Sequence, residues 1–290
     1  MLGILLIHKE VGGTSHDVVD QVRRRLGTRR VGHAGTLDPL ATGLLVLAVG
    51  PATRFLQYLP LEPKEYIAEI QFGRETTTYD LEGEVISDRP VPVNLTAKLE
   101  EVAPQFHGLI QQYPPMYSAV KVDGQPLYKY ARAGKDVERS LRTVHIQDLE
   151  IAVTGAQSAR ARVVCSGGTY IRTLAHDLGN AIGCGAHLSG LVRTRVGRFS
   201  IEHSVKLDQV TAENLIPLRT AIAPMPVIEL EAGQESDVRL GRKIQMRQNE
   251  DVTLTALARP GGEVFSVARQ IGDFLQPECV IPSEASHAIS

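Results

Sequence analysis

Residues 64–72 alternate between apolar and polar side chains, and this pattern narrows the possible folds more than any other stretch of the chain. The apolar positions are Tyr66, Ala68, Ile70 and Phe72. A period of two is that of a β-strand covered on one side. The chain must therefore contain a half-covered sheet, and Tyr66 is expected to point with the apolar face.

Other segments predict further strands and several helices. Strands are expected at residues 3–7, 44–49, 144–153 and 159–165. Helical spacing predicts helices at residues 17–26, 96–106, 126–133 and 169–182. Thr14 or Ser15 can cap the first of these helices and Thr96 the second. Mixed strands and helices of this kind indicate the α+β class.

The C-terminal part is expected to form a second, smaller unit. Pro217, Pro224 and Pro226 give the preceding segment the composition of a linker. Short strands follow at about 227–230, 251–258 and 263–269, with a hairpin turn at Gly261 and Gly262. We expect a large domain over residues 1–222 and a small β-rich domain over residues 223–290 that ends in a disordered tail.

Length and composition exclude several classes of protein. A chain of 290 residues with 43% hydrophobic residues can bury its own core without metal or disulfide staples. Its three cysteines have no C-x-x-C spacing, so we expect reduced thiols and no metal site. The first apolar run is too short for a signal or membrane segment. A cytoplasmic protein is expected.

The net charge of -2 hides opposed regions. Residues 19–32 carry five arginines against one acid, for a sum of +4. Residues 121–142 carry six basic and three acidic side chains, for +3, whereas residues 62–104 carry four basic and ten acidic, for -6. The total argues weakly against a polyanionic partner, but the local field decides where a phosphate backbone can dock.

Asp38 is the candidate for chemistry. It lies in a glycine-rich loop at residues 32–43, precedes a proline, and is the only acid between Asp20 and Glu62. An isolated Asp-Pro in a loop is more often a turn residue that bonds its own backbone than a catalytic one. The loop as a whole, Gly-His-Ala-Gly-Thr-Leu-Asp-Pro-Leu-Ala-Thr-Gly, resembles the catalytic motif of TruB-type tRNA pseudouridine synthases.

The resemblance extends along nearly the whole chain. Further family-like segments follow in the family's order at residues 116–121, 127–134, 168–172 and 185–188. Near the start the family usually has Asp-Lys-Pro, where this chain has His8, Lys9 and Glu10. The loss of that proline concerns the geometry of the loop and not the chemistry.

This family isomerises one tRNA uridine, usually numbered 55 in the T-loop, to pseudouridine, without metal or organic cofactor. The resemblance implies a pseudouridine synthase fold, with a central mixed, mainly antiparallel sheet flanked by helices. It also implies an RNA-binding insertion at about residues 114–142 and a PUA-like C-terminal domain. The target base must leave the helical stack, which costs a few kcal/mol.

The resemblance assigns roles to individual residues. Asp38 matches the catalytic aspartate, Arg172 the arginine that pairs with it, and Tyr66 the tyrosine that stacks on the flipped uracil. The positions matched to substrate binding are His33, Tyr170 and Leu191, and the basic insertion adds Lys121, Arg132 and Arg142. From the residues alone, a solvated charge is the better reading of Arg172, which lies opposite the apolar stripe of the expected helix at 169–182. For Tyr170 and Leu191, simple core packing is an equally good reading.

Three classes of function compete. The first is a stand-alone tRNA pseudouridine synthase, which acts as a monomer on the T-loop and T-stem. The second is a tRNA-binding or folding chaperone without required catalysis. The third is the catalytic subunit of a guide-RNA particle. The complete set Asp38, Tyr66 and Arg172 favours the first class, and the absence of long basic tails disfavours the third.

Overall fold

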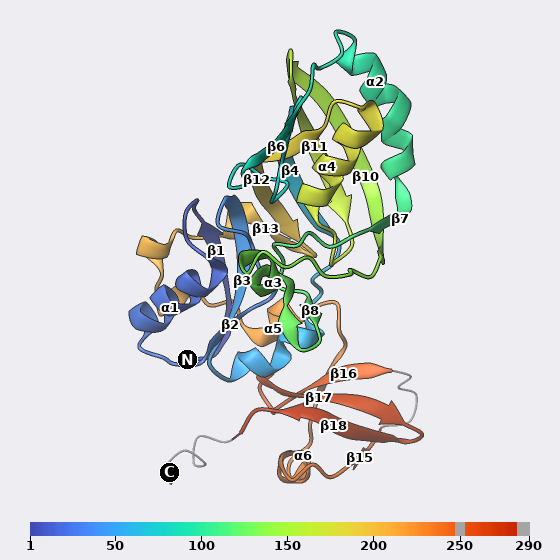
Figure 1. Cartoon of the computed structure of the whole chain (residues 1–290). Coiled ribbons are helices and arrows are strands. Elements are labelled where there is room, and N and C mark those ends of the chain that lie inside the picture. Colours follow the sequence, from blue (N-terminus) through green and yellow to red (C-terminus); the bar gives the residue numbers. More distant parts are fainter. Residues whose placement is uncertain (247–252, 283–290) are drawn as a thin grey trace.

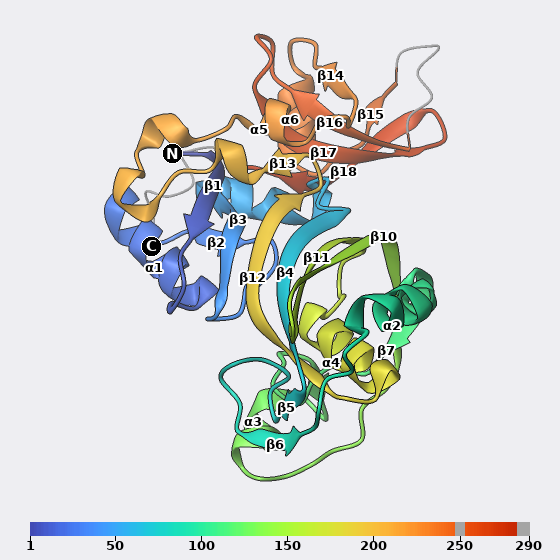
Figure 2. The same cartoon turned by 90° about the horizontal axis from the view of Figure 1, so that it is seen from above.

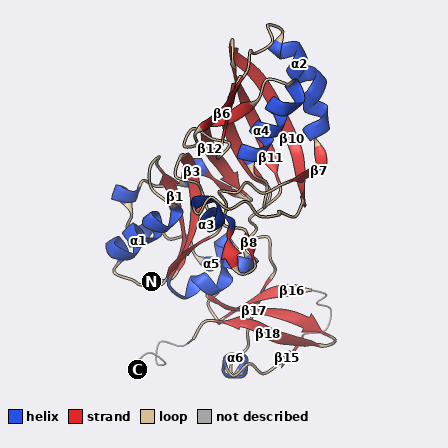
Figure 3. Ribbon diagram, viewed as in Figure 1, coloured by secondary structure: helices blue, strands red, loops and turns tan. Residues whose placement is uncertain are grey.

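The computed structural model describes residues 1–246 and 253–282, and the C-terminal tail expected to be disordered lies outside them. The chain forms one large sheet with helices on both ends of it and a separate smaller sheet formed by the C-terminal residues (Figures 1 and 3). This arrangement confirms the α+β class. None of the helices in the described residues combines the length and hydropathy that crossing a lipid bilayer demands.

The large sheet has nine strands, seven of which form a continuous path. In order along that path they are β1 (Gly3–Lys9), β3 (Ala41–Val49), β12 (Ala186–Val196), β4 (Lys64–Phe72), β11 (Ser158–Cys165), β10 (Arg142–Gly155) and β7 (Gly108–Gln112). Two short strands join from the side, β2 (Val31–His33) on β3 and β13 (Phe199–Ser200) on β12. All of these pairs are antiparallel except β3 with β12.

Strand β12 links the two halves of the large sheet, because it pairs with β3 on one side and with β4 on the other. No strand was expected at these residues from the sequence pattern. Its register against β4 shifts between Leu188 and Gly190 and again between Arg193 and Arg195. A bulge inserts one residue into a strand, so it interrupts the period of two on which such predictions depend.

The helices agree with the sequence apart from their ends. Helix α1 (Ser15–Leu26) begins after Thr14, which forms a capping box with Asp17. Helix α2 (Leu95–Val102) begins after Asn94, so Thr96 is not its cap, and a 3-10 turn, η2 (Ala103–Phe106), extends it. Figure 2 shows α2 and α4 (Ile171–Ile182) on the same side of the sheet, and α1 beside β1 and β3.

Shorter elements complete the large domain. Two small hairpins are formed by β5 (Arg74–Thr76) with β6 (Val85–Asp88) and by β8 (Lys121–Val122) with β9 (Gln125–Pro126). The remaining short helices are η1 (Gly50–Tyr58), α3 (Leu127–Arg132), η3 (Ile201–His203), η4 (Leu207–Gln209), η5 (Ala212–Asn214) and α5 (Leu218–Ala221). Helix α3 and the β8–β9 hairpin belong to the insertion that the sequence singled out.

The C-terminal sheet has the order β14 (Val227–Glu229), β16 (Leu254–Ala258), β17 (Val264–Ile271), β18 (Phe274–Val280) and β15 (Ile244–Gln245), with helix α6 (Gln234–Arg239) beside it. The predicted glycine turn joins β16 and β17. The expected linker is not a free segment, because it contains α5, whose Leu218 and Ala221 are buried. They belong to a hydrophobic cluster that runs from β1, β3 and η1 into the C-terminal sheet.

Candidate active site

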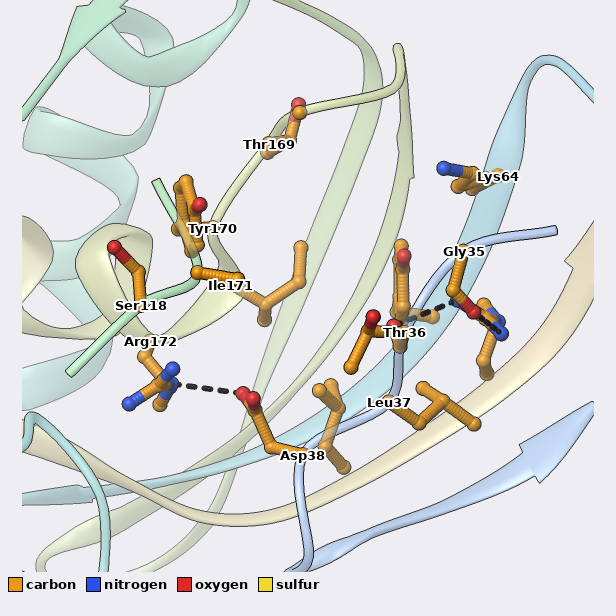
Figure 4. A pocket seen from close by; sticks show the side chains of 15 residues that line it. Gly35, Thr36, Leu37, Asp38, Lys64, Ser118, Thr169, Tyr170, Ile171 and Arg172 are labelled. Atoms are coloured by element: carbon orange, nitrogen blue, oxygen red, sulfur yellow. Dashed lines mark hydrogen bonds and ion pairs between the residues drawn. The ribbon is translucent and has the colours of Figure 1, made fainter. Parts of the chain in front are cut away.

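A cavity of about 260 Å³ opens beside the Asp38 loop. Ligand sites for drug-sized molecules span roughly 300–1,000 Å³, so this one suits a single small ring. Its walls come from the Asp38 loop, β4, β12, the turn before α4 and the insertion (Figure 4). The lining residues are Gly35, Thr36, Leu37, Asp38, Lys64, Tyr66, Ser118, Ala119, Gly168, Thr169, Tyr170, Ile171, Arg172, Leu191 and Arg193.

Arg172 lies between two carboxylates. Its Nε is 2.9 Å from Oδ2 of Asp38, and its Nη1 is 3.2 Å from Oδ2 of Asp80. The guanidinium also donates to the backbone oxygens of Thr78, at 3.2 Å, and Tyr117, at 2.9 Å. The Arg172 side chain is only 6% exposed, so it is not the solvated helix charge that periodicity left open. It is an ion-pair partner of Asp38, as the resemblance implied.

The charges around Asp38 act on its pKa in opposite directions. Burial raises the pKa of this carboxyl, and the charge of Asp80 adds to the rise. The guanidinium of Arg172 and, more weakly, the ammonium of Lys9 lower it, but the pKa remains above its ordinary value. The side chain is still 38% exposed toward the cavity. Arg172 therefore keeps the ionised form accessible in a place where burial alone would favour the acid.

Two side chains outside the cavity wall, those of Lys9 and Ser15, fix the backbone around Asp38. Nζ of Lys9 donates to the backbone oxygens of Ala41, at 2.7 Å, and Pro39, at 3.2 Å. The hydroxyl of Ser15 accepts from the backbone nitrogen of Leu37 at 2.8 Å and donates to its oxygen at 3.1 Å. The loop is thus held on both sides of the aspartate by groups that do not compete for its carboxylate.

Lys9 also shows how the chain accommodates Glu10, where the family usually has proline. Lys9 is 1% exposed, and its Nζ donates to the backbone oxygen of Glu10 at 3.0 Å. The Glu10 side chain lies outside, 3.7 Å from Nζ of Lys206. The replacement therefore leaves the lysine clamp on the Asp38 loop in place.

Arg193, on β12, forms the opposite clamp. It is 1% exposed, and its guanidinium donates to the backbone oxygens of Leu44, at 2.8 Å, Gly35, at 3.1 Å, and Thr36, at 3.3 Å. Gly43 makes the close approach of β3 and β12 possible, because a Cβ there would lie 2.3 Å from the Arg193 backbone oxygen. The parallel pairing of β3 with β12 thus brings the clamp to the loop.

Tyr66 forms one wall of the cavity and lies on the apolar face of β4, as the alternation predicted. It stands in register between Val163 on β11 and Arg193 on β12. The residue is 7% exposed, and burial raises the pKa of its hydroxyl. The phenol therefore stays protonated near neutral pH, and its ring offers a flat surface to a ligand in the cavity.

The other residues matched to substrate binding lie in different places. Tyr170 and Leu191 line the cavity. Tyr170 is fixed by Gln112, whose amide accepts from its backbone nitrogen at 3.0 Å and donates to its oxygen at 3.3 Å. His33, on β2, is outside the lining, and its buried Nδ1 has no hydrogen-bond partner in the described residues. Burial lowers the pKa of His33, so the neutral ring is favoured.

The basic residues of the insertion do not enter the cavity. Lys121, Arg132 and Arg142 are exposed, and no ion pair joins any of them to a carboxylate within the part of the chain described. The acidic stretch at 62–104 differs, because several of its carboxylates are paired with arginines. Glu65, for example, lies 3.0 Å from Arg162 and 3.1 Å from Arg195. Within the described residues these three positive charges of the insertion are therefore left without a carboxylate partner.

Asp80 is the main residue that sequence reasoning missed. Asp38 has no acidic neighbour in the sequence, but the fold brings a carboxylate that is 2% exposed to the same guanidinium. Thr78 and the backbone nitrogen of Glu82 donate to Asp80. The adjacent Tyr79 has a positive φ of 63° and stacks on His176 of α4, with ring centroids 3.8 Å apart.

Lys9 and Arg193 were also missed as members of the site. No local pattern marks any of these three residues, since each acts through groups that are distant in the chain. In the described residues, no group of three or more His, Cys, Asp or Glu side chains has the geometry of a metal site. The groups of the cavity that could act on a ligand are the Asp38 carboxylate, its partner Arg172 and the ring of Tyr66.

Comparisons with known proteins identify the family. Residues 23–171 match the profile described as TruB family pseudouridylate synthase (N terminal domain), and residues 172–227 match tRNA pseudouridylate synthase B C-terminal domain. A protein of Thermobifida fusca (strain YX) named tRNA pseudouridine synthase B is 44% identical over 290 residues, which cover 96% of this chain and 98% of that protein. The protein of the same name from Azoarcus sp. (strain BH72) is 41% identical over 289 residues, covering 97% and 95%.

A solved structure supports the same assignment at the level of the fold. A chain in the crystal structure of a Cbf5-Nop10-Gar1 complex superposes with a TM-score of 0.71 at 26% identity, covering 98% of this chain and 86% of that chain. The sequence matches extend through the Asp38 loop, β4 and the start of α4, which together build the cavity. The chain belongs to the TruB family of pseudouridylate synthases.

Proposed function

We propose that this protein isomerises uridine 55 in the T-loop of tRNA to pseudouridine, and that it does so without a guide RNA, metal or organic cofactor. One observation carries the proposal. The Asp38 carboxylate is held against Arg172 at the edge of a cavity of the size of one base, with the Tyr66 ring as a wall. The 44% identity to a tRNA pseudouridine synthase B over almost the whole chain supports the tRNA substrate.

The reaction needs one ionised carboxylate and a place for a detached base. The bond between C1′ of the ribose and N1 of uracil breaks, the uracil turns, and C5 bonds to C1′. The proton on C5 then leaves, and N1 takes up a proton. Attack on the sugar, attack on the base and proton abstraction from the sugar all require Asp38 to be charged. Arg172 opposes the effect of burial on the pKa of Asp38, and it also fixes the direction of the carboxylate.

Base flipping explains the aromatic and apolar walls. Stacking on an aromatic side chain is worth ~1–3 kcal/mol per base, which offsets much of the cost of extruding the uridine. Tyr66 is the stacking residue in this proposal, and Tyr170 and Leu191 confine the base from other sides. His33, on the neighbouring β2, enters the T-loop and fills the position that the uridine has left.

Binding of the RNA falls to the surfaces around this pocket. The insertion at about residues 114–142 brings Lys121, Arg132 and Arg142 to the phosphate backbone as exposed, unpaired charges. We assign residues 1–222 to catalysis and residues 223–290 to a PUA-like domain that binds the RNA away from the T-loop. The proposed enzyme is cytoplasmic. It acts as a monomer in this proposal, because every residue assigned to the site lies on one chain.

Incubation of the purified chain with an unmodified tRNA transcript tests the proposal. Pseudouridine at position 55, formed with no guide RNA and in the presence of a chelator, is the expected result. A transcript with cytidine at position 55 is the matched control and should give no product. Binding without product would favour the chaperone class instead, and product only after addition of a guide RNA would favour the particle subunit.

A further inference from the structure

Lys64 is the one basic side chain of the cavity wall that has no partner in residues 1–246 and 253–282. Arg172 contacts two carboxylates, and Arg193 donates to three backbone oxygens. Lys64 lines the same cavity and forms neither a hydrogen bond nor an ion pair within those residues. Figure 4 shows its ammonium turned toward the cavity, across from the pair of Asp38 and Arg172.

The strand places Lys64 beside the aromatic wall. Lys64 and Tyr66 are two residues apart on β4, so their side chains leave the same face of the sheet. A strand rises by about 3.3 Å per residue, which puts the two Cα atoms roughly 7 Å apart. Lys64 Nζ lies between two glycine segments, because a Cβ on Gly35 or on Gly167 would stand 3.6 Å from it. A base stacked on Tyr66 is therefore within reach of the ammonium.

Two positive charges, on Lys64 and Arg193, lie at this end of the cavity, and the carboxylate of Glu62 is near the ammonium without pairing with it in the described residues. Burial lowers the pKa of Lys64, and the nearby charge of Arg193 lowers it further, whereas Glu62 opposes both effects only in part. No carboxylate neutralises the ammonium at contact distance in the described residues. Such a site is unfavourable when empty and favourable when negative charge develops in it.

We propose that Lys64 is a further catalytic residue, whose ammonium donates a hydrogen bond to a carbonyl oxygen of the flipped uracil and stabilises the negative charge on the departing base. The inference rests on the proposed isomerisation. When the bond between C1′ and N1 breaks, its electron pair stays with the uracil and spreads from N1 to the carbonyl oxygens. The charge is consumed when C5 bonds to C1′, after which the C5 proton leaves and N1 takes up a proton.

The test compares Lys64→Met with the wild-type chain in single turnovers at saturating enzyme. Methionine keeps most of the apolar stem and removes the charge, and thermal unfolding checks that the fold is intact. With uridine at position 55, the rate should fall on the order of 10²-fold, as for other preorganised electrostatic donors. Lys64→Arg, which keeps the charge, should recover part of this loss. Lys98→Met, on α2 and paired with Glu101, is the control outside the site and should leave the rate unchanged.

A substituted base separates this role from a structural one. Fluorine at C5 withdraws electrons and stabilises the uracil anion without help from the protein. The measurement is the rate at which 5-fluorouridine at position 55 is consumed. Lys64→Met should lower this rate less than about tenfold relative to the wild-type chain. An equal loss for both bases would overturn the proposal. So would an unchanged single-turnover rate with a weaker salt dependence of tRNA binding, because Lys64 would then bind a phosphate.

Wild-type turnover separates failure of this inference from failure of the proposed function. If the wild-type chain forms no pseudouridine from the plain transcript, the proposed function is wrong. If the wild-type chain is active and Lys64→Met matches it with both bases, only the assignment of Lys64 is wrong.

Discussion

The two buried arginines of the cavity wall, Arg172 and Arg193, have the same charge and opposite surroundings. Arg172 meets two carboxylates, Asp38 and Asp80. Arg193 donates to three backbone oxygens on the segment that leads to and from Asp38, and no ion pair joins it to a carboxylate in the described residues. The first arginine therefore favours the ionised form of the Asp38 carboxylate and fixes its direction. The second sets the path of the loop that carries it.

This division shows that one type of side chain does two jobs in a single site. A guanidinium has five N–H donors in a fixed plane, so it can bridge two acids or fasten several carbonyls with equal ease. Which job it does depends on the partners that the fold supplies. The difference can be tested, because loss of a charge partner changes the pH dependence of catalysis, whereas loss of a clamp changes stability.

The largest effect is expected when the acid of the Arg172 pair is removed. Asp38→Asn keeps the size of the side chain but has no charge for the reaction, so turnover should fall below detection. Binding of tRNA should persist, because contacts to the phosphate backbone supply most of the affinity. Single-turnover formation of pseudouridine and filter binding measure the two quantities. A rate near that of wild type would remove Asp38 from the chemistry.

Removal of the charge on Arg172 should slow catalysis and shift its pH dependence. The pKa of Asp38 is already raised by burial, and Arg172 is the main group that lowers it. In Arg172→Gln the pKa of Asp38 therefore rises further. Activity needs the ionised carboxylate, so the acid limb of the pH profile should lie at a higher pH than in the wild-type chain. We expect a rate loss on the order of 10²–10³-fold near neutral pH. The pH profile of the single-turnover rate measures both effects.

Arg193→Gln is the matched control for that experiment. Arg193 is not among the charges that shift the pKa of Asp38, so the acid limb of its profile should stay at the wild-type pH even if the rate falls. Equal shifts in both variants would contradict the division of roles between the two arginines.

Loss of the clamp should appear as loss of stability. Arg193→Met removes the hydrogen bonds that the guanidinium donates to the backbone oxygens of Leu44, Gly35 and Thr36. Buried groups that lose a partner cost about 1–3 kcal/mol each, and we expect the free energy of unfolding to fall by about 3 kcal/mol in total. Urea denaturation measures it. Arg160→Met, which removes a 60% exposed partner of Glu69, should cost less than about 1 kcal/mol.

The same comparison explains what the sequence could and could not predict. Tyr66 was placed on the correct face because alternation along β4 is local, and Asp38 stood out because its loop is a continuous motif. Arg193 reaches Leu44 across 149 positions, and Arg172 reaches Asp80 across 92. Such partners follow from the pairing of β3 with β12 and of β12 with β4, and the bulges in β12 hid that strand from the pattern.

Helix α4 shows a further limit of periodicity. Its apolar stripe predicted that Arg172 would face away from the core, as a solvated charge does. The structure buries Arg172 with the stripe, because the Asp38 loop and the Asp80 loop bring carboxylates to that side of the helix. A buried charge can be recognised only when its partners are known, so the family motif, and not the pattern, identified this arginine.

The exposed arginines of the insertion provide the smallest expected effect, and they contrast with both buried ones. Arg132→Ala combined with Arg142→Ala removes two exposed charges that have no carboxylate partner in the described residues. Binding of tRNA should weaken, and the slope of its affinity against salt should become shallower by up to about 2, since each lost phosphate contact releases roughly one fewer counterion. Stability and the single-turnover rate at saturating enzyme should change little. An unchanged slope would place both residues outside the RNA footprint.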